Sequence, residues 1–412
     1  MDFNDNPEEA TYRAEVRAWL EANAEPLLPG ESASTVEDGD NNEIIALAQT
    51  WQAKKFDAGW ACLSWPKKFG GRAAKGMHSV IWRQEEKRFN VPPDIFQCSV
   101  GMTGPTLMAH GTEEQLERWL PAIARGEDIY CQLFSEPGAG SDLSAVRTRA
   151  KRDGDDWIID GHKIWTSLAQ YANWGILVTR TDFDAPKHAG LTYFIVDLSS
   201  PGIEIRSIKQ ISGGETFNEV FLSGVRVPDA NRIGDVGNGW RVTLTTLANE
   251  RGAIAGAGAG KISIAGLIKL ASRLSDDAGP LIQQDSVKEK LADLYMQSRG
   301  LRYTSLRTLS ALSQGKKAGP EGSIGKLGAA IMRQEMTAFA IELQGIAGSI
   351  DSLEVGVEGS TWQSGYLFSP AARIAGGTDE IQRDIIAERV LGLPREPRVD
   401  KALPFKDIPI GR

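Results

Sequence analysis

The sequence predicts an α+β fold in which a helical domain, an antiparallel β domain and a four-helix bundle follow one another along the chain. Three observations predict it. Apolar residues recur with helical spacing towards both ends, strand-like runs between turn residues fill the middle, and 412 residues suffice for about three domains. We expect an N-terminal helical domain at 1–127, a β-barrel or sheet at 128–240, the bundle at 241–395, and an extended tail at 396–412.

The first helix has a clear start signal. Asn6 can cap a helix whose first position is Pro7 and whose first turn is acidic. The apolar residues that follow lie on one helical face: Tyr12, Val16, Trp19 and Leu20. Three further stretches of this region also fit helices: 44–59, 77–89 and 113–125.

In the middle region, Asp160-Gly161 separates two strand-like runs at 157–159 and 163–165, which predicts a hairpin. The other expected strands are 175–179, 191–196, 203–208 and 219–227. Long helical patterns return afterwards, at 238–275, 285–315, 322–347 and 378–391, and four such helices indicate a bundle.

Composition excludes several classes of function. The net charge of -8 argues against a nucleic-acid or anionic-membrane partner, because both select for clustered basic residues. Cys62, Cys98 and Cys131 have no disulfide or zinc spacing, and the histidines show no ligand spacing, so no metal is expected. The acidic N-terminus and the lack of a long apolar run predict a cytoplasmic protein without a membrane span.

Three short strings combine residue types suited to a ligand. In 130–142, Gly138 and Gly140 let the backbone approach a ligand, while Ser135 and Ser141 offer hydroxyls, although such a loop alone is more often a turn. In 163–167, a tryptophan stands beside two hydroxyl residues; without context it would be a core residue. In 374–383, Thr378 is a plausible helix cap.

Together these strings resemble the acyl-CoA dehydrogenases, and the resemblance covers nearly the whole chain. It implies bound FAD and oxidation of an acyl thioester at its α,β carbons. It also implies roles for particular residues: Phe134 and Ser135 along the flavin ring, Ser141 at the pyrophosphate, Gly140 as a further cofactor contact, Trp165 against the flavin, Ser167 at its reactive edge, and Thr378 and Glu380 at the adenosine end.

The position of the catalytic base departs from the commonest pattern of that family. Many members carry a glutamate where this chain has Gly376, whereas a minority branch places it on an earlier helix, one residue before an arginine. Asn249-Glu250-Arg251 matches that second pattern, so Glu250 is the candidate base and Arg251 a candidate contact to CoA. The backbone N–H of Gly376 could still donate to the thioester oxygen, and burial beside flavin and acyl chain would make a carboxylate a stronger base.

Two family strings are altered here, at 273–280 and 342–348. Both belong to the FAD cradle that the family shares across a subunit interface. A heteromer with a related subunit therefore stays open beside a homo-oligomer, and so does a non-catalytic subunit that completes a partner's site. A flavin oxidase or monooxygenase on the same scaffold is a further alternative. The family implies an electron-transfer flavoprotein as acceptor, and the sequence leaves the acyl chain open.

The glycines that follow the candidate base, Gly252, Gly256 and Gly260, recur every four residues. They do not fit a phosphate loop, because Gly260-Lys261 is followed by isoleucine. A small-residue face for close helix packing is the favoured interpretation, and a widened acyl pocket is the alternative.

Overall fold

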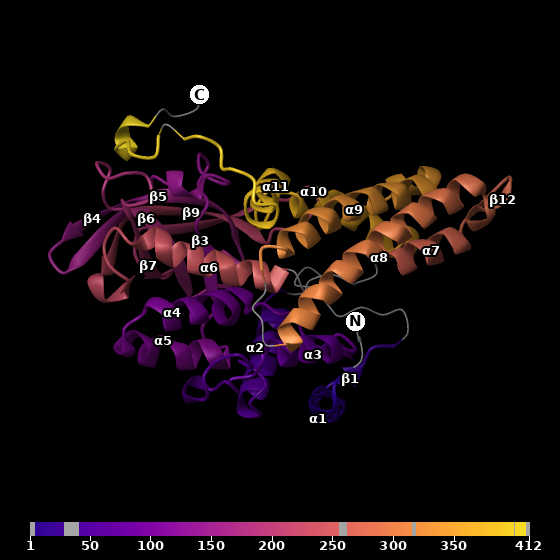
Figure 1. The fold of residues 1–412 in the computed structure, drawn as a ribbon, viewed down its shortest axis with the longest axis horizontal. Coiled ribbons are helices and arrows are strands. Elements are labelled where there is room, and N and C mark those ends of the chain that lie inside the picture. Colours follow the sequence, from indigo (N-terminus) through magenta and orange to yellow (C-terminus); the bar gives the residue numbers. More distant parts are fainter. Residues whose placement is uncertain (1–4, 29–40, 255–261, 315–318, 399, 409–412) are drawn as a thin grey trace. The chain divides into compact units, whose positions relative to one another are not determined.

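The computed structural model describes residues 5–28, 41–254, 262–314, 319–398 and 400–408. The chain divides into two compact units, each of which draws on separate segments. The first unit comprises 1–33, 75–91 and 254–394, and the second comprises 34–74, 92–253 and 395–412. Both are drawn as ribbons in Figure 1.

The second unit contains a sheet in which eight strands are found among the described residues, in the order β10-β7-β6-β4-β5-β9-β8, with β3 also paired to β6. The strands are β3 (Tyr130–Leu133), β4 (Arg149–Asp153), β5 (Asp156–Ser167), β6 (Trp174–Arg180), β7 (Leu191–Asp197), β8 (Ile203–Ile208), β9 (Phe217–Pro228) and β10 (Arg232–Ile233). All pairs are antiparallel except β3–β6 and β4–β6, which are parallel. The expected α+β architecture is confirmed, and these two parallel pairs are an addition to it.

The central strands are buried on both faces. Because successive side chains of a strand point to opposite faces of the sheet, they belong to two separate hydrophobic clusters. Ile176 on β6 and Tyr193 on β7 face a cluster shared with helices, including Val242. Their neighbours Leu177 and Phe194 face the opposite cluster, which the other strands supply. The sheet thus has helices on one face and strand side chains on the other, and the helices on that face position the candidate site.

The hairpin expected at Asp160-Gly161 is wrong. These residues lie inside the long strand β5, and the chain reverses at 154–155, between β4 and β5. Gly161 is a glycine for another reason: a Cβ there would lie 2.3 Å from the Thr148 hydroxyl oxygen, and the register with β9 shifts beside it. A glycine at a close approach and bulge has the same sequence signal as a glycine in a turn.

Helices of the second unit are α2 (Asn41–Asp57), α4 (Gly104–His110), α5 (Glu113–Arg125) and α6 (Gly239–Ile254). A π-helical segment, Gln97–Thr103, precedes α4. Within the unit α5 packs on both α2 and α4. The predicted helix at 238–275 is described in two parts, α6 and the first unit's α7; Gly256 and Gly260 lie outside the described residues.

The first unit contains a helical bundle of α7 (Ile264–Arg273), α8 (Asp285–Ser313), α9 (Gly322–Leu343), α10 (Thr361–Ala372) and α11 (Asp379–Ile385). Leu270, Leu294, Phe339 and Trp362, from four of these helices, share one buried cluster. The short strand pair β11 (Ser275–Asp276) and β12 (Gly279–Pro280) lies between α7 and α8. A second strand pair, β1 (Glu25–Pro26) with β2 (Phe89–Asn90), also belongs to this unit.

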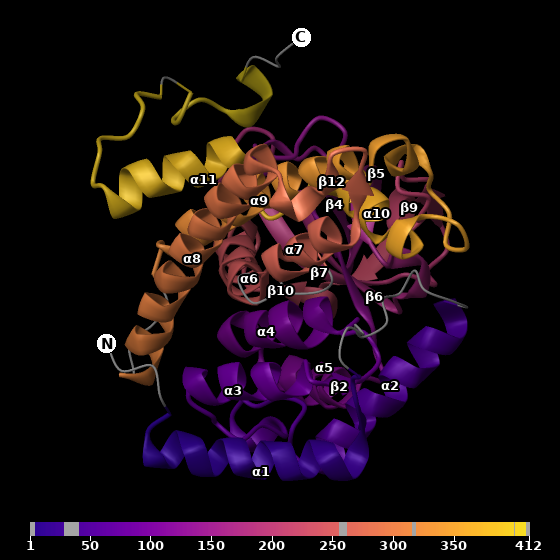
Figure 2. The same ribbon diagram turned by 90° about the vertical axis from the view of Figure 1, so that its right-hand side faces the viewer.

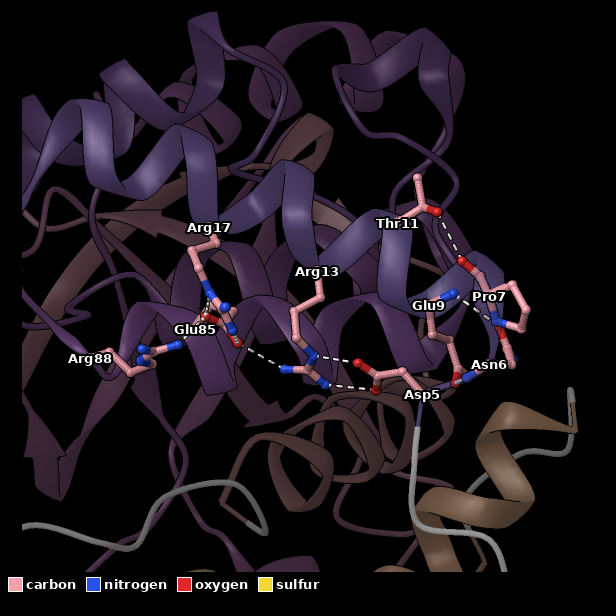
Figure 3. A network of polar contacts seen from close by, with 9 residues as sticks. All are labelled: Asp5, Asn6, Pro7, Glu9, Thr11, Arg13, Arg17, Glu85 and Arg88. Atoms are coloured by element: carbon pink, nitrogen blue, oxygen red, sulfur yellow. Dashed lines mark hydrogen bonds and ion pairs between the residues drawn. The ribbon is translucent and has the colours of Figure 1, made fainter.

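The same unit contains α1 (Pro7–Asn23) and α3 (Gly76–Glu86), which pack side by side (Figure 2). Asn6 caps α1 as expected, in a reciprocal capping box with Glu9. Glu85 on α3 is buried and binds Arg13 and Arg17 of α1 at 3.0 Å each (Figure 3). Arg88 adds a third contact at 2.9 Å, so one buried carboxylate joins the two helices.

Among the described residues, no helix is long and apolar enough to cross a membrane.

Candidate active site

The strand β3 leads directly into the first candidate string. Phe134 is buried and meets Tyr193 edge to face, with ring centroids 5.9 Å apart. The carbonyl of Ser135 accepts a hydrogen bond from the Ile164 amide of β5 at 2.9 Å. The first two candidate strings, 130–142 and 163–167, are therefore joined by main-chain contact.

A buried lysine holds this junction in place. The Lys163 ammonium lies 3.0 Å from the Phe134 carbonyl, 2.8 Å from a Glu136 carboxylate oxygen and 2.8 Å from the Val178 carbonyl. Burial lowers the pKa of Lys163, and the charge of Glu136 opposes that effect. Burial alone would raise the pKa of Glu136, but the Lys163 charge and several hydrogen bonds outweigh it and lower that pKa.

Trp165 has an unusual backbone conformation. Its φ is +61°, which is unusual for a bulky residue, and the ladder with β9 is irregular between Lys163 and Thr166. The indole is 58% exposed and contacts Phe217 edge to face. Ser167, two residues on, is exposed as well. A large aromatic that is kept in solvent at a strained bulge indicates a surface for a ligand to stack on.

The turn after Glu136 leaves room for a ligand. Glu136 and Ala139 exchange two backbone hydrogen bonds of 3.0 Å, which closes a tight turn. A Cβ built at Gly138 or Gly140 would meet no protein atom within 4 Å, and Ser141 is exposed. Open backbone, a free hydroxyl and an exposed indole in one unit fit a flavin nucleotide.

Glu250 belongs to the same unit as these strings. It is partly buried near the C-terminal end of α6, and one carboxylate oxygen lies 3.4 Å from the Gln132 amide nitrogen of β3. One turn earlier, Thr246 lies 3.1 Å from the Tyr193 hydroxyl. Because Tyr193 also contacts Phe134, this face of α6 is tied to the end of β3 at two points.

The remaining candidates lie in the first unit, apart from Arg251, of which only the helical backbone is described. Gly376 and Gly377 have φ of +64° and +92°. Thr378 caps α11 as expected, its hydroxyl accepting from the Ile381 amide at 3.3 Å. Glu380 follows in the first turn and is exposed. The carbonyl of Gly377 accepts from the Lys326 ammonium at 2.6 Å, which helps to fix this turn.

Sequence reasoning missed three residues that support the site. Glu136 and Lys163 were inside the motifs, but nothing in the sequence indicated that they pair across two strands. Gln132 also lies inside the first string, but nothing in the sequence indicated its contact to Glu250, which spans 118 residues. The free cysteines are unsuited to nucleophilic roles: burial raises the pKa of Cys62 and of Cys98 to about 12.

Comparisons with known proteins agree with this geometry. The N-terminal, middle and C-terminal domain models of acyl-CoA dehydrogenase match residues 6–127, 131–225 and 237–391. The acyl-CoA dehydrogenase IpdE1 of Mycobacterium tuberculosis is 38% identical over 94% of this chain and 98% of its own length.

Two solved structures are also similar. The Tcur3481-Tcur3483 steroid ACAD has a TM-score of 0.78 and 28% identity, covering 96% of this chain and 100% of that one. The ChsE4-ChsE5 complex of Mycobacterium tuberculosis has a TM-score of 0.77 and 29% identity, with the same coverage. By its domains, its relatives and its fold, the chain belongs to the acyl-CoA dehydrogenase family and is an oxidoreductase whose cofactor is FAD.

Proposed function

We propose that this enzyme removes hydrogen from the α,β carbons of an acyl-CoA thioester, with Glu250 as the base that takes the α-proton. The observation that carries the proposal is the contact between Glu250 and Gln132. It joins the candidate base to the strand that runs directly into Phe134 and Ser135, the predicted flavin contacts.

Gln132 gives Glu250 a defined orientation. The Gln132 amide donates to one oxygen of this carboxylate, and a carboxylate is the kind of group that can take up the substrate proton. Bound FAD supplies the two-electron acceptor for the hydride that leaves the β-carbon. The aromatic surface of Trp165 and the hydroxyl of Ser167 are the residues that we expect to hold and orient the flavin ring.

The backbone at 376 supports an earlier position for the base. A φ of +64° favours glycine and disfavours a glutamate, whose Cβ would be strained there. The backbone at 376 therefore disfavours a catalytic carboxylate at that position, and Glu250 is our candidate base. The N–H of Gly376 stays our candidate donor to the thioester oxygen, Arg251 our candidate CoA contact, and Thr378 and Glu380 our candidates at the adenosine end.

For the substrate we propose a steroid-derived acyl-CoA. The similar Tcur3481-Tcur3483 structure is that of a steroid ACAD, and the similarity covers nearly the whole of this chain. The alternative interpretation of the glycines after Glu250, a widened acyl pocket, would suit a bulky acyl group. An electron-transfer flavoprotein as acceptor and a cytoplasmic location remain predictions.

We also propose a related, non-identical partner chain. Both similar structures are named as pairs of chains. The first altered family string begins at Arg273, whose side chain forms an ion pair with Glu358 of the same chain at 3.0 Å. Ile346, where the family string has glycine, is 93% exposed, and Leu353 is 87% exposed. Apolar side chains that are this exposed in a structured segment are typical of an interface that another chain covers.

The test is an anaerobic titration of the yellow holoenzyme with a panel of straight-chain, aromatic and steroid-derived acyl-CoAs. We expect the flavin absorbance to bleach with a steroid-derived thioester, and the bleaching rate to fall at least about a thousandfold in Glu250→Gln. Glu289→Gln is the matched control, because it changes an exposed carboxylate on a helix.

Each part of the proposal can fail separately. Bleaching at the wild-type rate in Glu250→Gln would remove the base assignment and leave the family intact. A colourless protein that gains flavin only on co-expression with a related chain would support the heteromer. Preference for straight-chain thioesters would overturn the steroid assignment, and rapid reoxidation by air would indicate an oxidase.

A further inference from the structure

The last described segment of the chain belongs to the second unit and packs against the rest of that unit. Phe405 is 2% exposed, and its amide donates to the Ala185 carbonyl at 3.0 Å. The next amide, of Lys406, donates to the Phe183 carbonyl at 3.0 Å, and the Lys406 ammonium pairs with Asp184 at 2.6 Å. The segment 400–408, yellow in Figure 1, forms a short helical turn at Phe405–Asp407.

Phe405 covers a buried cation. The guanidinium carbon of Arg180, a fully buried residue, lies 3.4 Å from the Phe405 ring centroid. Burial lowers the pKa of Arg180 to about 10, so the side chain stays charged at neutral pH. A guanidinium uses its edge for hydrogen bonds and its face for an aromatic ring, and here both are occupied.

The hydrogen bonds of Arg180 converge on the loop beside Ser141. The guanidinium donates to the carbonyl of Ser144 at 2.7 Å and to that of Val146 at 3.1 Å. A third bond, of 3.1 Å, goes to the carbonyl of Lys187, whose ammonium pairs with Asp142. Arg180 therefore holds the middle and the end of the loop 142–146 directly, and it is linked to the start of the loop through Lys187, which pairs with Asp142. This loop directly follows the residue expected at the FAD pyrophosphate.

We infer that Phe405 is a positioning residue for FAD: by covering Arg180, it fixes the loop that presents Ser141 to the pyrophosphate. The inference rests on the proposed role of that loop, but it assigns a function to a chain segment that lies more than 250 positions away. The physical basis is that a charge–ring contact is strong only when water is excluded, so the ring holds Arg180 against the carbonyls.

The test measures FAD affinity of the apoprotein by quenching of flavin fluorescence. We expect Phe405→Leu to raise the dissociation constant about tenfold, because the apolar volume stays and the ring is lost. Phe405→Tyr keeps a ring and should return the value to within about threefold of wild type. Phe89→Leu, the same change at a buried site in the first unit, should leave it unchanged.

A second measurement needs no variant. Because coupling is reciprocal, FAD should slow hydrogen exchange at the amides of Phe405 and Lys406 in the wild-type protein. Equal FAD affinity in Phe405→Leu and wild type, or unchanged exchange at these two amides, would overturn the inference. A wild-type protein that binds no FAD at all would instead contradict the proposed function, so the two failures are distinguishable.

Discussion

Each unit contains a carboxylate whose side chain is at most 9% exposed and is paired with basic side chains, and the two pairs differ in their surroundings. Glu136 in the second unit pairs with Lys163, and Glu85 in the first pairs with three arginines. Glu85 joins two helices of regular backbone, α1 and α3. Glu136, in the turn after β3, pairs with Lys163 of β5, two residues before Trp165, whose φ is positive and whose ring is exposed. The same interaction joins two helices in one place and, in our proposal, supports the flavin-binding surface in the other.

The comparison teaches where to look for function. A buried ion pair alone is weak evidence for a site, because structural pairs perturb pKa values too. The pair in the second unit lies close in sequence to Trp165, one non-glycine residue that combines a positive φ with an exposed aromatic ring. Disrupting the two ion pairs should therefore affect stability and FAD affinity differently, and urea unfolding and flavin titration can separate the two effects.

The largest effect is expected from Lys163→Met. This change leaves Glu136 buried without its cation, which costs about 3–5 kcal/mol in the free energy of unfolding. FAD affinity should fall as well, because the Phe134 carbonyl loses its donor. Urea unfolding followed by circular dichroism measures the first quantity, and flavin fluorescence measures the second.

A double variant sharpens that result. Glu136→Gln added to Lys163→Met removes the unpaired charge, so much of the stability should return while FAD affinity stays low. If the double variant regained both, the pair would serve stability alone and the contrast with Glu85 would disappear.

The next effect is expected from Glu85→Gln. Burial alone would raise the pKa of Glu85, but Arg17 and Arg13 outweigh it and lower the pKa to about 2, from an ordinary 4.5. The group thus contributes stability above pH 4.5 that is lost as pH falls towards 2. We expect Glu85→Gln to cost about 2–3 kcal/mol at pH 7 and clearly less at pH 3.

FAD affinity distinguishes Glu85→Gln from Lys163→Met. We expect Glu85→Gln to bind FAD as tightly as the wild type does. The measurement is the urea midpoint at both pH values together with a flavin titration. A stability difference that stayed constant from pH 7 to pH 3 would contradict the pKa assignment.

Local signals explain which elements the sequence could predict. Asn6 and Pro7 start α1 by their own chemistry, and the periodic apolar residues of the later strands specify β6 to β9. The hairpin at Gly161 failed because a glycine required by the nearby Thr148 cannot be told from a turn glycine in one sequence. Predictions succeeded where the cause was local and failed where it was a distant neighbour.

The residues of the candidate site also divide into those with a local sequence signal and those whose contacts are distant in the sequence. Trp165 could be singled out from its motif, yet its positive φ could not, because the bulge depends on pairing with β9. Lys163, Gln132 and Phe405 act through partners far along the chain, so no spacing rule reveals them. The structure supplies these contacts, and the roles of the site residues stay predictions for the experiments above.

The smallest effect on stability is expected from Lys75→Ala. This variant tests whether burial of the ion pair is the reason for the larger losses expected from Lys163→Met and Glu85→Gln. The Lys75 ammonium lies 2.8 Å from a Glu8 carboxylate oxygen, the same distance as between Lys163 and Glu136. Both side chains of the first pair are more than 60% exposed, whereas Lys163 is fully buried. Solvent screens an exposed pair, so we expect no measurable change in the urea midpoint, at low salt or high. A loss comparable with that of Lys163→Met would mean that distance, not burial, decides the strength of these pairs.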